Sequence, residues 1–267
     1  MTIRRETRDR VALLIIDRPA LRNAVDPATA QALFQAMQTV DQDTSIDATI
    51  LTGAEDAFCA GFDLKAAGSV AARSWIDACA IPKGWDDPIA APLPSPMGPA
   101  RLIPVKPVIA AVEGYAVAGG MELALWADLR VVAEDAVFGV FCRRWGVPLI
   151  DGGTVRLPRL VGQGRANDLI LTGRPVAAKE AAAIGLAERV CPPGRALETA
   201  FDLALGLSRF PQACLRADHR AARPDPASLA AALTREWRGV AAFYSEGRDG
   251  AARFAAGLGR GGAFDRI

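Results

Sequence analysis

The hydrophobic pattern of this chain alternates between short apolar runs and segments in which apolar residues recur every three or four positions. Apolar runs at residues 11–17, 48–53 and 107–112 predict buried strands, and the runs at 128–133 and 136–140 predict two more. Their lengths are typical of strands covered on both faces. The first two thirds of the chain therefore read as an α/β arrangement, provided that helices separate the strands.

Helical periodicity does separate them. Asp26-Pro27 predicts the start of a first helix, and the pattern returns at residues 154–171 and 177–184. Between the second and third apolar runs, residues 66–100 are rich in proline and lose all periodicity, which predicts a long functional loop that gates a pocket.

Beyond Pro192 the chain changes character and no strand is expected. Three amphipathic helices are predicted there, at residues 194–209, 211–222 and 226–244. We therefore divide the chain into an α/β core, residues 1–193, and a C-terminal helical module, residues 194–267. The apolar faces of the module exceed what a small tail can bury alone, which predicts a partner subunit; they comprise Leu197, Phe201, Leu205, Leu229, Leu233, Trp237 and Phe243.

Composition excludes several classes of protein. The 267 residues carry 31 basic and 30 acidic side chains, so charge gives no reason to expect nucleic acid or an anionic membrane as a partner. The N-terminus lacks the apolar core of a secretory signal, and Glu113 and Glu122 interrupt the longest apolar region, so no membrane span is expected. Five scattered cysteines, odd in number and without metal-ligand spacing, predict a protein of the reducing cytoplasm without a metal site.

The strongest candidate for chemistry is Gly119-Gly120-Met121-Glu122, directly after an apolar strand. Glycines at the start of a helix leave backbone N–H groups free, and the helix dipole adds positive potential there. Such N–H groups stabilise a developing oxyanion, and Glu122 lies one turn away to move a proton. A tight turn with a capping glutamate is the alternative interpretation.

Five motifs in order point to a known family. Arg18-Pro19 with Asn23-Ala24, the Ala60-Gly61-Phe62-Asp63-Leu64 turn and residues 106–122 are followed by Gly146-Val147-Pro148 with Gly152-Gly153-Thr154 and by residues 171–190. Together they resemble the enoyl-CoA hydratase/isomerase (crotonase) superfamily over nearly the whole chain. The resemblance implies the crotonase-like (ClpP/crotonase) α/β fold, a spiral of ββα repeats, with a C-terminal α-helical module that builds a homotrimer or a dimer of trimers.

The resemblance also implies an acyl-CoA thioester as substrate, with coenzyme A part of the substrate and no separate cofactor. The thioester oxygen would lie between the N–H groups of Phe62 and Gly119, and Glu122 would be the general acid/base. The resemblance further implies a set of substrate-binding residues: Ala60, Phe62, Asp63, Leu64, Lys65, Gly119 and Cys142. From the residues alone, Asp63 reads more readily as a helix cap, and Lys65 either faces the CoA phosphates or is solvated.

One departure from the family pattern bears on the reaction. Hydratases of this family use a second glutamate, and that position is Cys142 here, where a thiol with a reference pKa of about 8.5 is a poor substitute. Asp151 is the nearest replacement carboxylate, although it also fits a helix N-cap. Arg143 and Arg144 either recognise a substrate carboxylate, pair with Asp151, or lie at the surface or a subunit contact.

We therefore expect hydration of a 2-enoyl-CoA, with double-bond isomerisation as a close alternative because one carboxylate suffices to move a proton between carbons. A catalytically weak acyl-CoA-binding paralogue, or a protein whose oligomer surface serves a partner, are further alternatives. The single histidine, His219, lies in the helical module and does not favour a Ser-His-Asp or Cys-His site. Phosphate loops of the nucleotide-binding type are missing from the sequence.

Overall fold

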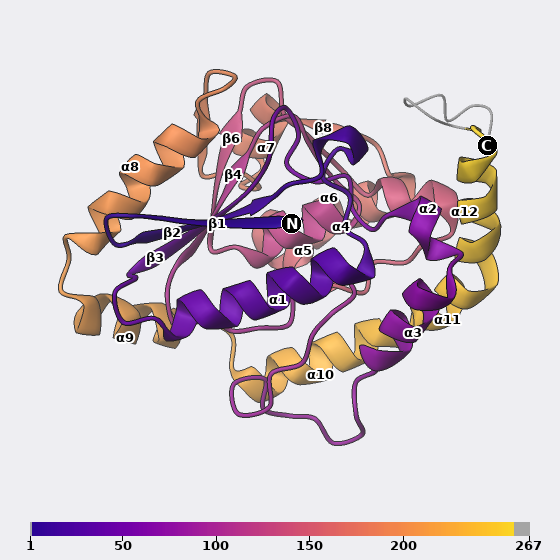
Figure 1. The fold of residues 1–267 in the computed structure, drawn as a ribbon, viewed down its shortest axis with the longest axis horizontal. Coiled ribbons are helices and arrows are strands. Elements are labelled where there is room, and N and C mark those ends of the chain that lie inside the picture. Colours follow the sequence, from indigo (N-terminus) through magenta and orange to yellow (C-terminus); the bar gives the residue numbers. More distant parts are fainter. Residues whose placement is uncertain (1, 259–267) are drawn as a thin grey trace.

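The computed structural model describes residues 2–258 and centres on a six-stranded sheet (Figure 1). The strand order is β1-β2-β3-β4-β6-β9; β1 pairs antiparallel with β2, and the other neighbours are parallel. The strands are β1 (Ile3–Arg8), β2 (Val11–Ile16), β3 (Ala48–Gly53), β4 (Val108–Val112), β6 (Leu129–Ala133) and β9 (Arg189–Cys191). All six residues of β2 are buried, as its unbroken apolar run predicts for a strand covered on both faces.

A smaller three-stranded sheet, in the order β5-β7-β8, lies beside the large one and carries the connection to the site. Its strands are β5 (Tyr115–Val117), β7 (Val137–Gly139) and β8 (Val176–Ala177). The helix α4 (Gly119–Trp126) follows β5 directly and is buried along its whole length. This ordered alternation of strands and helices agrees with the predicted α/β core.

Helices cover the two faces of the large sheet (Figure 1). On one face, α1 (Pro27–Gln42) packs Leu33 and Met37 against Leu14 of β2. On the other, α8 (Ala196–Ser208) packs Ala200 against Leu13. Because successive side chains of a strand point to opposite faces, β2 contributes side chains to the apolar cores on both faces of the sheet.

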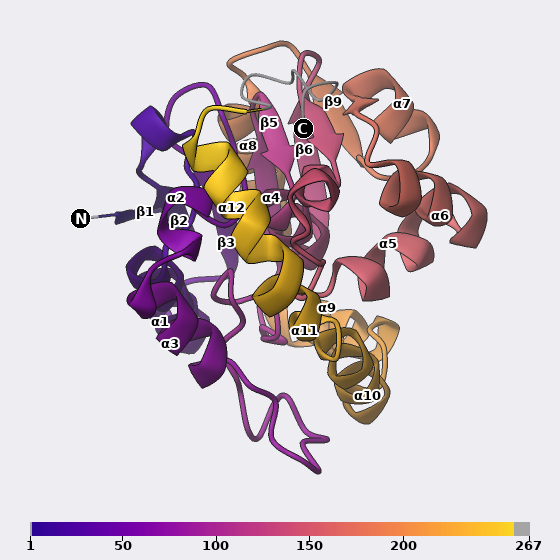
Figure 2. The same cartoon turned by 90° about the vertical axis from the view of Figure 1, so that its right-hand side faces the viewer.

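The C-terminal part of the chain is helical, as predicted, but the long helix expected at residues 226–244 is broken. After α8, the C-terminal part comprises α9 (Gln212–Ala222), α10 (Pro226–Trp237), α11 (Val240–Ala242), the π-helical turn η3 (Phe243–Gly247) and α12 (Arg248–Ala255). Figure 2 shows α12 beside α2 (Leu64–Ala67), a segment far away in the sequence. Leu229, Leu233 and Phe243, which we expected at a subunit contact, are buried within this chain.

Two further expectations need correction. The proline-rich segment 66–100 is not a loop throughout, because Ser69 caps a helix, α3 (Val70–Ala78), inside it. The helix expected at 154–171 is two helices, α5 (Gly153–Val161) and α6 (Gln163–Thr172), which separate at Gly162, where φ is +82°. The 3₁₀ turns η1 (Pro19–Leu21) and η2 (Phe141–Trp145) and the short helix α7 (Ala178–Ala183) complete the described elements.

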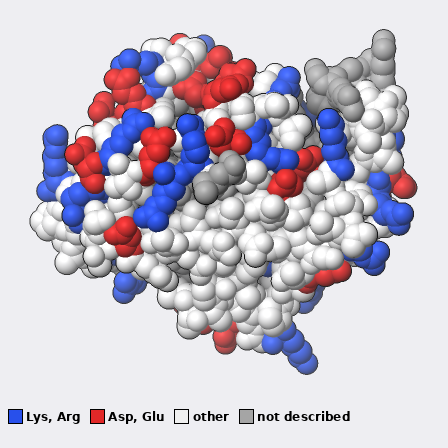
Figure 3. All heavy atoms as spheres, in the orientation of Figure 1, with Lys and Arg blue, Asp and Glu red and all other residues white. Residues whose placement is uncertain are grey.

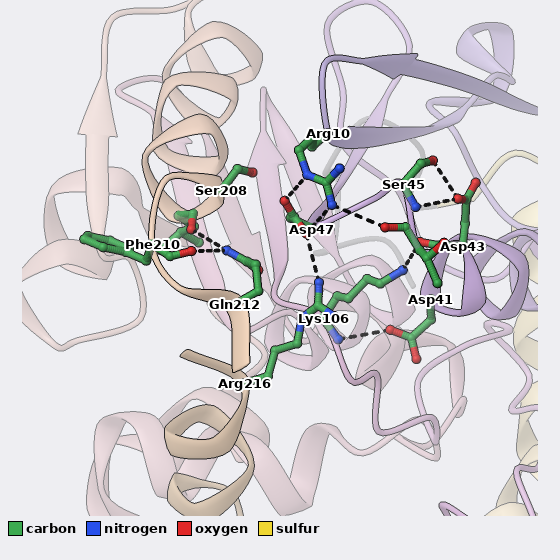
Figure 4. A network of polar contacts seen from close by, with 12 residues as sticks. Arg10, Asp41, Asp43, Ser45, Asp47, Lys106, Ser208, Phe210, Gln212 and Arg216 are labelled. Carbon is green, nitrogen blue, oxygen red and sulfur yellow. Dashed lines mark hydrogen bonds and ion pairs between the residues drawn. The ribbon is translucent and has the colours of Figure 1, made fainter. Parts of the chain in front are cut away.

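Charges are mixed on the surface and organised where helices dock. Basic and acidic side chains interleave over the upper part of the face in Figure 3, consistent with a net charge near zero. In the network of Figure 4, buried Asp47 accepts hydrogen bonds from Arg10 and from Arg216 of α9, the latter at 3.0 Å. Asp47, directly before β3, thus links α9 to Arg10 in the turn between β1 and β2. No helix within residues 2–258 is long and apolar enough to cross a membrane.

The turn between β5 and α4 is the most strained point near the site. Ala118 adopts φ +53° and ψ −127°, a conformation that glycine adopts easily and that a Cβ disfavours. A side chain on the next-but-one residue, Gly120, would bring its Cβ within 2.0 Å of the carbonyl oxygen of Cys59, so helix α4 packs directly on backbone. Ala118 therefore stores strain that its surroundings impose.

We predict that Ala118→Gly raises the free energy of unfolding by about 1 kcal/mol, because it removes that strain. Urea denaturation measures the change. Ala116→Gly is the control, since Ala116 is a buried alanine two residues earlier in β5, whereas Ala118 is partly buried, and Ala116 is not among the residues with positive φ. The control should lose stability, and a loss of the same size in Ala118→Gly would contradict the assignment of strain.

Candidate active site

A cavity of about 660 Å³ opens where α4, α2 and the C-terminal helices meet. All the residues that sequence reasoning proposed for catalysis or substrate binding line it. They are Ala60, Phe62, Asp63, Leu64, Lys65, Gly119, Glu122, Cys142 and Asp151. The chain therefore brings together residues that are up to 91 positions apart, from Ala60 to Asp151; their individual roles stay predictions.

The two predicted amide donors lie close to each other. Val25 exchanges hydrogen bonds with Gly61 and Asp63, the residues on either side of Phe62, so the Phe62 N–H points away from Val25. A Cβ added to Gly61 would lie 2.9 Å from the nitrogen of Gly119, so the missing side chain of Gly61 lets the two segments approach. Within residues 2–258, neither the Phe62 nor the Gly119 N–H donates a hydrogen bond.

Glu122 is buried, with 2% of its surface exposed, and one of its oxygens is fully engaged. Its Oε1 accepts hydrogen bonds from the N–H groups of Asp151 and Gly153, both at 2.9 Å. Burial raises the pKa of Glu122 well above its ordinary value, and the negative charges of Asp151 and Glu236 raise it further. Because both hydrogen bonds go to Oε1, Oε2 is the oxygen available to exchange a proton with a molecule in the cavity.

Asp151 supplies a second buried carboxylate in the same cavity. Its Oδ1 accepts a hydrogen bond from the Met97 N–H at 2.8 Å, and the Ser95 hydroxyl also bonds to the carboxylate. Burial raises the pKa of Asp151, and those hydrogen bonds oppose the rise. The alternative role as a helix cap is wrong, because the Asp151 side chain binds the segment before β4 and no N–H of α5.

Cys142 lies in η2 and is buried, with burial raising the pKa of its thiol to about 12. Burial is the larger cause of this rise, and the nearby charge of Glu122 contributes to it. The thiol is therefore neutral at physiological pH, and it lines the cavity as a small, weakly polar group.

Charged side chains at one rim of the cavity are arranged by turns. Asp63 caps α2 through the N–H groups of Lys65 and Ala66, as expected, and it also pairs with Arg18. Arg22 lies over the ring of Tyr115 at 5.2 Å, and together with Lys65 it lines this rim. The rim therefore presents two exposed cations, Arg22 and Lys65.

Arg143 and Arg144 do not line the cavity. The Arg143 Nε donates to the carbonyl of Ile170, and Arg144 donates to the carbonyl of Gly173 and lies over the ring of Phe141. Neither has an ion pair with Asp151 in the described part of the chain. Their interpretation as outward-facing residues is the one that agrees with these contacts.

Sequence reasoning missed a third buried carboxylate, Glu236 of α10. It accepts hydrogen bonds from the N–H of Gly152 at 2.6 Å and from the N–H and hydroxyl of Thr154 at 2.8 and 2.7 Å. Glu236 therefore caps α5 from another helix. A signal was present, because Glu236 falls on the same helical face as Leu229 and Leu233, where a charged residue is out of place.

Comparisons with known proteins show which family and fold this chain is similar to. The family model described as enoyl-CoA hydratase/isomerase matches residues 6–85 and 101–249. Enoyl-CoA hydratase EchA19 of Mycobacterium tuberculosis is 40% identical over 204 residues, which cover 76% of this chain and 73% of that protein. A 2,3-dehydroadipyl-CoA hydratase of Escherichia coli is 35% identical over 229 residues, covering 85% and 84%. The crystal structure of a carnitinyl-CoA hydratase from Mycobacterium avium matches 96% of each chain, with a TM-score of 0.78 and 32% identity.

The chain belongs to the enoyl-CoA hydratase/isomerase family. Its fold is that of the crotonase superfamily, as the sequence motifs indicated, and it is an enzyme of this family. Acyl-CoA thioesters are the class of substrate with which this family works.

We predict that Glu122→Gln stabilises the fold at neutral and alkaline pH. An unfolded glutamate has a pKa of about 4.5, and the folded one is raised, so folding takes up a proton between these values. The wild-type protein therefore loses stability as the pH rises through this window, whereas glutamine keeps the two hydrogen bonds to Oε1 without a charge. The variant should gain roughly 1.4 kcal/mol for each unit of pKa difference that the pH has passed.

Urea denaturation at about pH 5 and about pH 8 measures this gain, which should be larger at the higher pH. Glu134→Gln, on the exposed turn after β6, is the control for removal of a surface glutamate, and the gain of Glu122→Gln is measured relative to it. A variant that is destabilised equally at both values would contradict the raised pKa.

Proposed function

We propose that this enzyme hydrates 2-enoyl-CoA thioesters, with Glu122 as general acid/base and Asp151 as the second carboxylate. The observation that carries the proposal is the meeting of two unpaired backbone N–H groups and two buried carboxylates in one cavity. Carbonyl polarisation and proton transfer are the two requirements for adding water to a conjugated thioester.

In the proposed reaction, the thioester oxygen accepts hydrogen bonds from the N–H groups of Phe62 and Gly119. The oxygen of a water molecule adds to C3, the double-bond electrons move onto the thioester oxygen, and an enolate forms. Oε2 of ionised Glu122 takes one proton from the water, and the protonated carboxyl of Asp151 gives one proton to C2. The pair holds one proton before and after the step, so the net change is addition of one water. Preorganised amide donors contribute roughly 2.7–4 kcal/mol each to such a step.

In this proposal Asp151 supplies the second carboxylate, which a glutamate provides in other hydratases of the family and which Cys142 cannot provide here. Two buried carboxylates in one cavity resist simultaneous ionisation, because each raises the energy of the other's charge. One of the pair then holds a proton while the other accepts a hydrogen bond from water. This division between acid and base is what hydration needs and what a neutral thiol cannot provide.

Double-bond isomerisation of an enoyl-CoA is the second candidate function, and the neutral Cys142 is the observation that favours it. One carboxylate can move a proton between two carbons without a held water. Under this alternative Asp151 only supports the loop before α5. The two reactions are separable by their products.

Substrate and assembly complete the proposal. Lys65 and Arg22 form a positive rim suited to the phosphates of CoA, and no cofactor is needed beyond the CoA of the substrate. We further propose a homotrimer or dimer of trimers in the cytoplasm. The reduced state of all the described cysteines is compatible with that compartment. The division into a catalytic core, residues 1–193, and an oligomerisation module, residues 194–267, stays a prediction.

The test compares hydration of crotonyl-CoA with isomerisation of a 3-enoyl-CoA in four proteins. These are the wild type, Glu122→Gln, Asp151→Asn, and the double variant Asp151→Asn with Cys142→Glu. Both single variants should lower kcat for hydration by at least about 100-fold, since each removes one acid/base group. The double variant should recover about 10-fold or more, because it restores a carboxylate at the family position.

Acyl-CoA binding in each variant is the control for folding, and it should change little. Full hydratase activity in Asp151→Asn would remove Asp151 from the reaction. Isomerase activity that exceeds hydratase activity in the wild type would favour the second candidate function.

A further inference from the structure

Charged side chains line only part of the cavity, and their distribution indicates which acyl groups the cavity can bind. Its charged lining residues fall into two groups: the rim with Arg22, Asp63 and Lys65, and the catalytic pair Glu122 and Asp151. No serine, threonine, asparagine, glutamine or histidine is among the described residues that line it. Away from the rim and the carboxylates, the wall therefore offers a ligand few side-chain hydrogen bonds.

The rest of the wall is apolar and partly aromatic. Ile76 of α3, Val147, Phe62 and Phe243 of η3 belong to one apolar cluster and also line the cavity. The rings of Phe62 and Phe243 meet edge to face, with centroids 6.4 Å apart. Trp145 and Phe254 form a second such pair at 5.3 Å, so the C-terminal helices supply half of these aromatic contacts.

Nearby cations do not reach this wall. Arg101 is 1% exposed, stacks on Trp237 at 4.5 Å, and donates to the carbonyls of Cys79 and Pro94. Arg143 donates to the carbonyl of Ile170 outside the cavity. A carboxylate on the acyl group would therefore lose its water without gaining a cation, and it would approach Glu122 and Asp151.

Building on the proposed function, we propose that the acyl group of the substrate is uncharged and apolar, of medium chain length or with a ring. Its apolar end packs against Ile76, Val147 and the two phenylalanines. The 2,3-dehydroadipyl-CoA hydratase of Escherichia coli is named for an acyl group with a second carboxylate. The wall of this chain selects against such a group, so relatives at similar identity differ in the charge of their substrates.

Binding of saturated CoA esters tests this proposal without any reaction. We expect the full-length protein to bind octanoyl-CoA at least about 30-fold more tightly than adipoyl-CoA in a calorimetric titration, since the second carboxylate stays unpaired. Equal affinity for the two esters would overturn the proposal. Because neither ester has a double bond to hydrate, the result is independent of whether hydration itself is the reaction.

A pair of variants in α3 localises the selection. Ile76→Lys should reduce the difference in binding affinity between octanoyl-CoA and adipoyl-CoA to less than about 5-fold, because it supplies a cation in the wall. Val70→Lys, in the same helix but 83% exposed, is the matched control and should keep the wild-type preference. If Ile76→Lys does not fold, Phe243→Ala replaces it and should weaken the binding of octanoyl-CoA more than that of adipoyl-CoA. Equal weakening of both would contradict the proposal that this wall binds the apolar end of the acyl group.

A different observation carries a second proposal, which concerns Glu236. The N–H groups that hold Glu122 belong to Asp151 and Gly153, and the N–H groups that hold Glu236 belong to Gly152 and Thr154. Four consecutive N–H groups thus alternate between the two carboxylates. The position of the Glu122 carboxylate depends on this turn, and the turn is held from its other side by α10.

We propose that Glu236 is a positioning residue for the reaction, acting on Glu122 through residues 151–154. Its two oxygens together accept three hydrogen bonds, which favour the ionised carboxylate, whereas burial raises the pKa of Glu236. Besides fixing the turn, a negative charge on Glu236 disfavours ionisation of Glu122. The other ionisable groups around Glu122 are Asp151, Cys142 of η2 and Arg156 of α5, and Arg101 interacts with Asp151 and Glu236.

Glu236→Gln tests the positioning role. We expect kcat to fall about 10-fold with little change in KM, and the acid limb of the pH profile of kcat/KM to move down by about half a unit or more. Asp225→Ala is the control, because Asp225 caps α10 itself through Ser228 and lies outside the cavity. Asp225→Ala should lower the melting temperature but leave the pH profile of kcat/KM unchanged.

A Glu236→Gln protein that behaves like Asp225→Ala, less stable with an unchanged pH profile, would make Glu236 a helix cap alone. The pH dependence of unfolding gives a second readout that needs no turnover, since Glu122 titrates in it. Thr154→Val removes one bond to Glu236 and keeps its charge. It should lower kcat by a smaller factor without moving the acid limb, and a shift as large as that of Glu236→Gln would contradict the role of the charge.

Discussion

Burial of the Glu122 carboxylate is the constraint on which the site depends. A carboxylate removed from water is costly unless donors replace the water, and here the N–H groups of Asp151 and Gly153 do so at a single oxygen. The other oxygen keeps a raised proton affinity and faces the cavity. The same desolvation that costs stability makes the group able to give and take a proton near neutral pH.

The position of this carboxylate depends on three segments that are distant from one another in the sequence. Helix α4 carries Glu122, the turn before α5 carries its donors, and α10 carries Glu236, which holds that turn. Ala118, in its strained conformation, starts α4 where the Gly119 N–H meets the cavity. Strain and buried charge are thus concentrated at one point of an otherwise ordinary apolar core.

Sequence reasoning found most elements whose signals are local. Apolar runs located β2, β3 and β4 because these strands are buried on both faces, and Asp26-Pro27 marked the start of α1. It missed β1, a mostly exposed and charged edge strand whose sequence has no apolar pattern and which joins the sheet by pairing with β2. Motif resemblance placed Phe62, Gly119 and Glu122 in one site, and closeness in the sequence suggested Asp151 as a replacement carboxylate. The structure sets all four around the same cavity.

Residues whose role depends on contacts between distant segments escaped that reasoning. Met97 and Ser95 hold Asp151 from a segment that looked like an unstructured loop, and Glu236 reaches the site from 85 positions beyond Asp151. Helical periodicity predicted the apolar face of α10 but assigned it to another subunit, whereas Leu233 and Phe243 pack within this chain. The C-terminal helices therefore do two things at once: they close the apolar wall of the cavity, and they fix the carboxylate at its centre. A change in these helices that alters the acyl pocket also acts on the turn that holds Glu122, so in this chain substrate selection and acid/base chemistry are not independent.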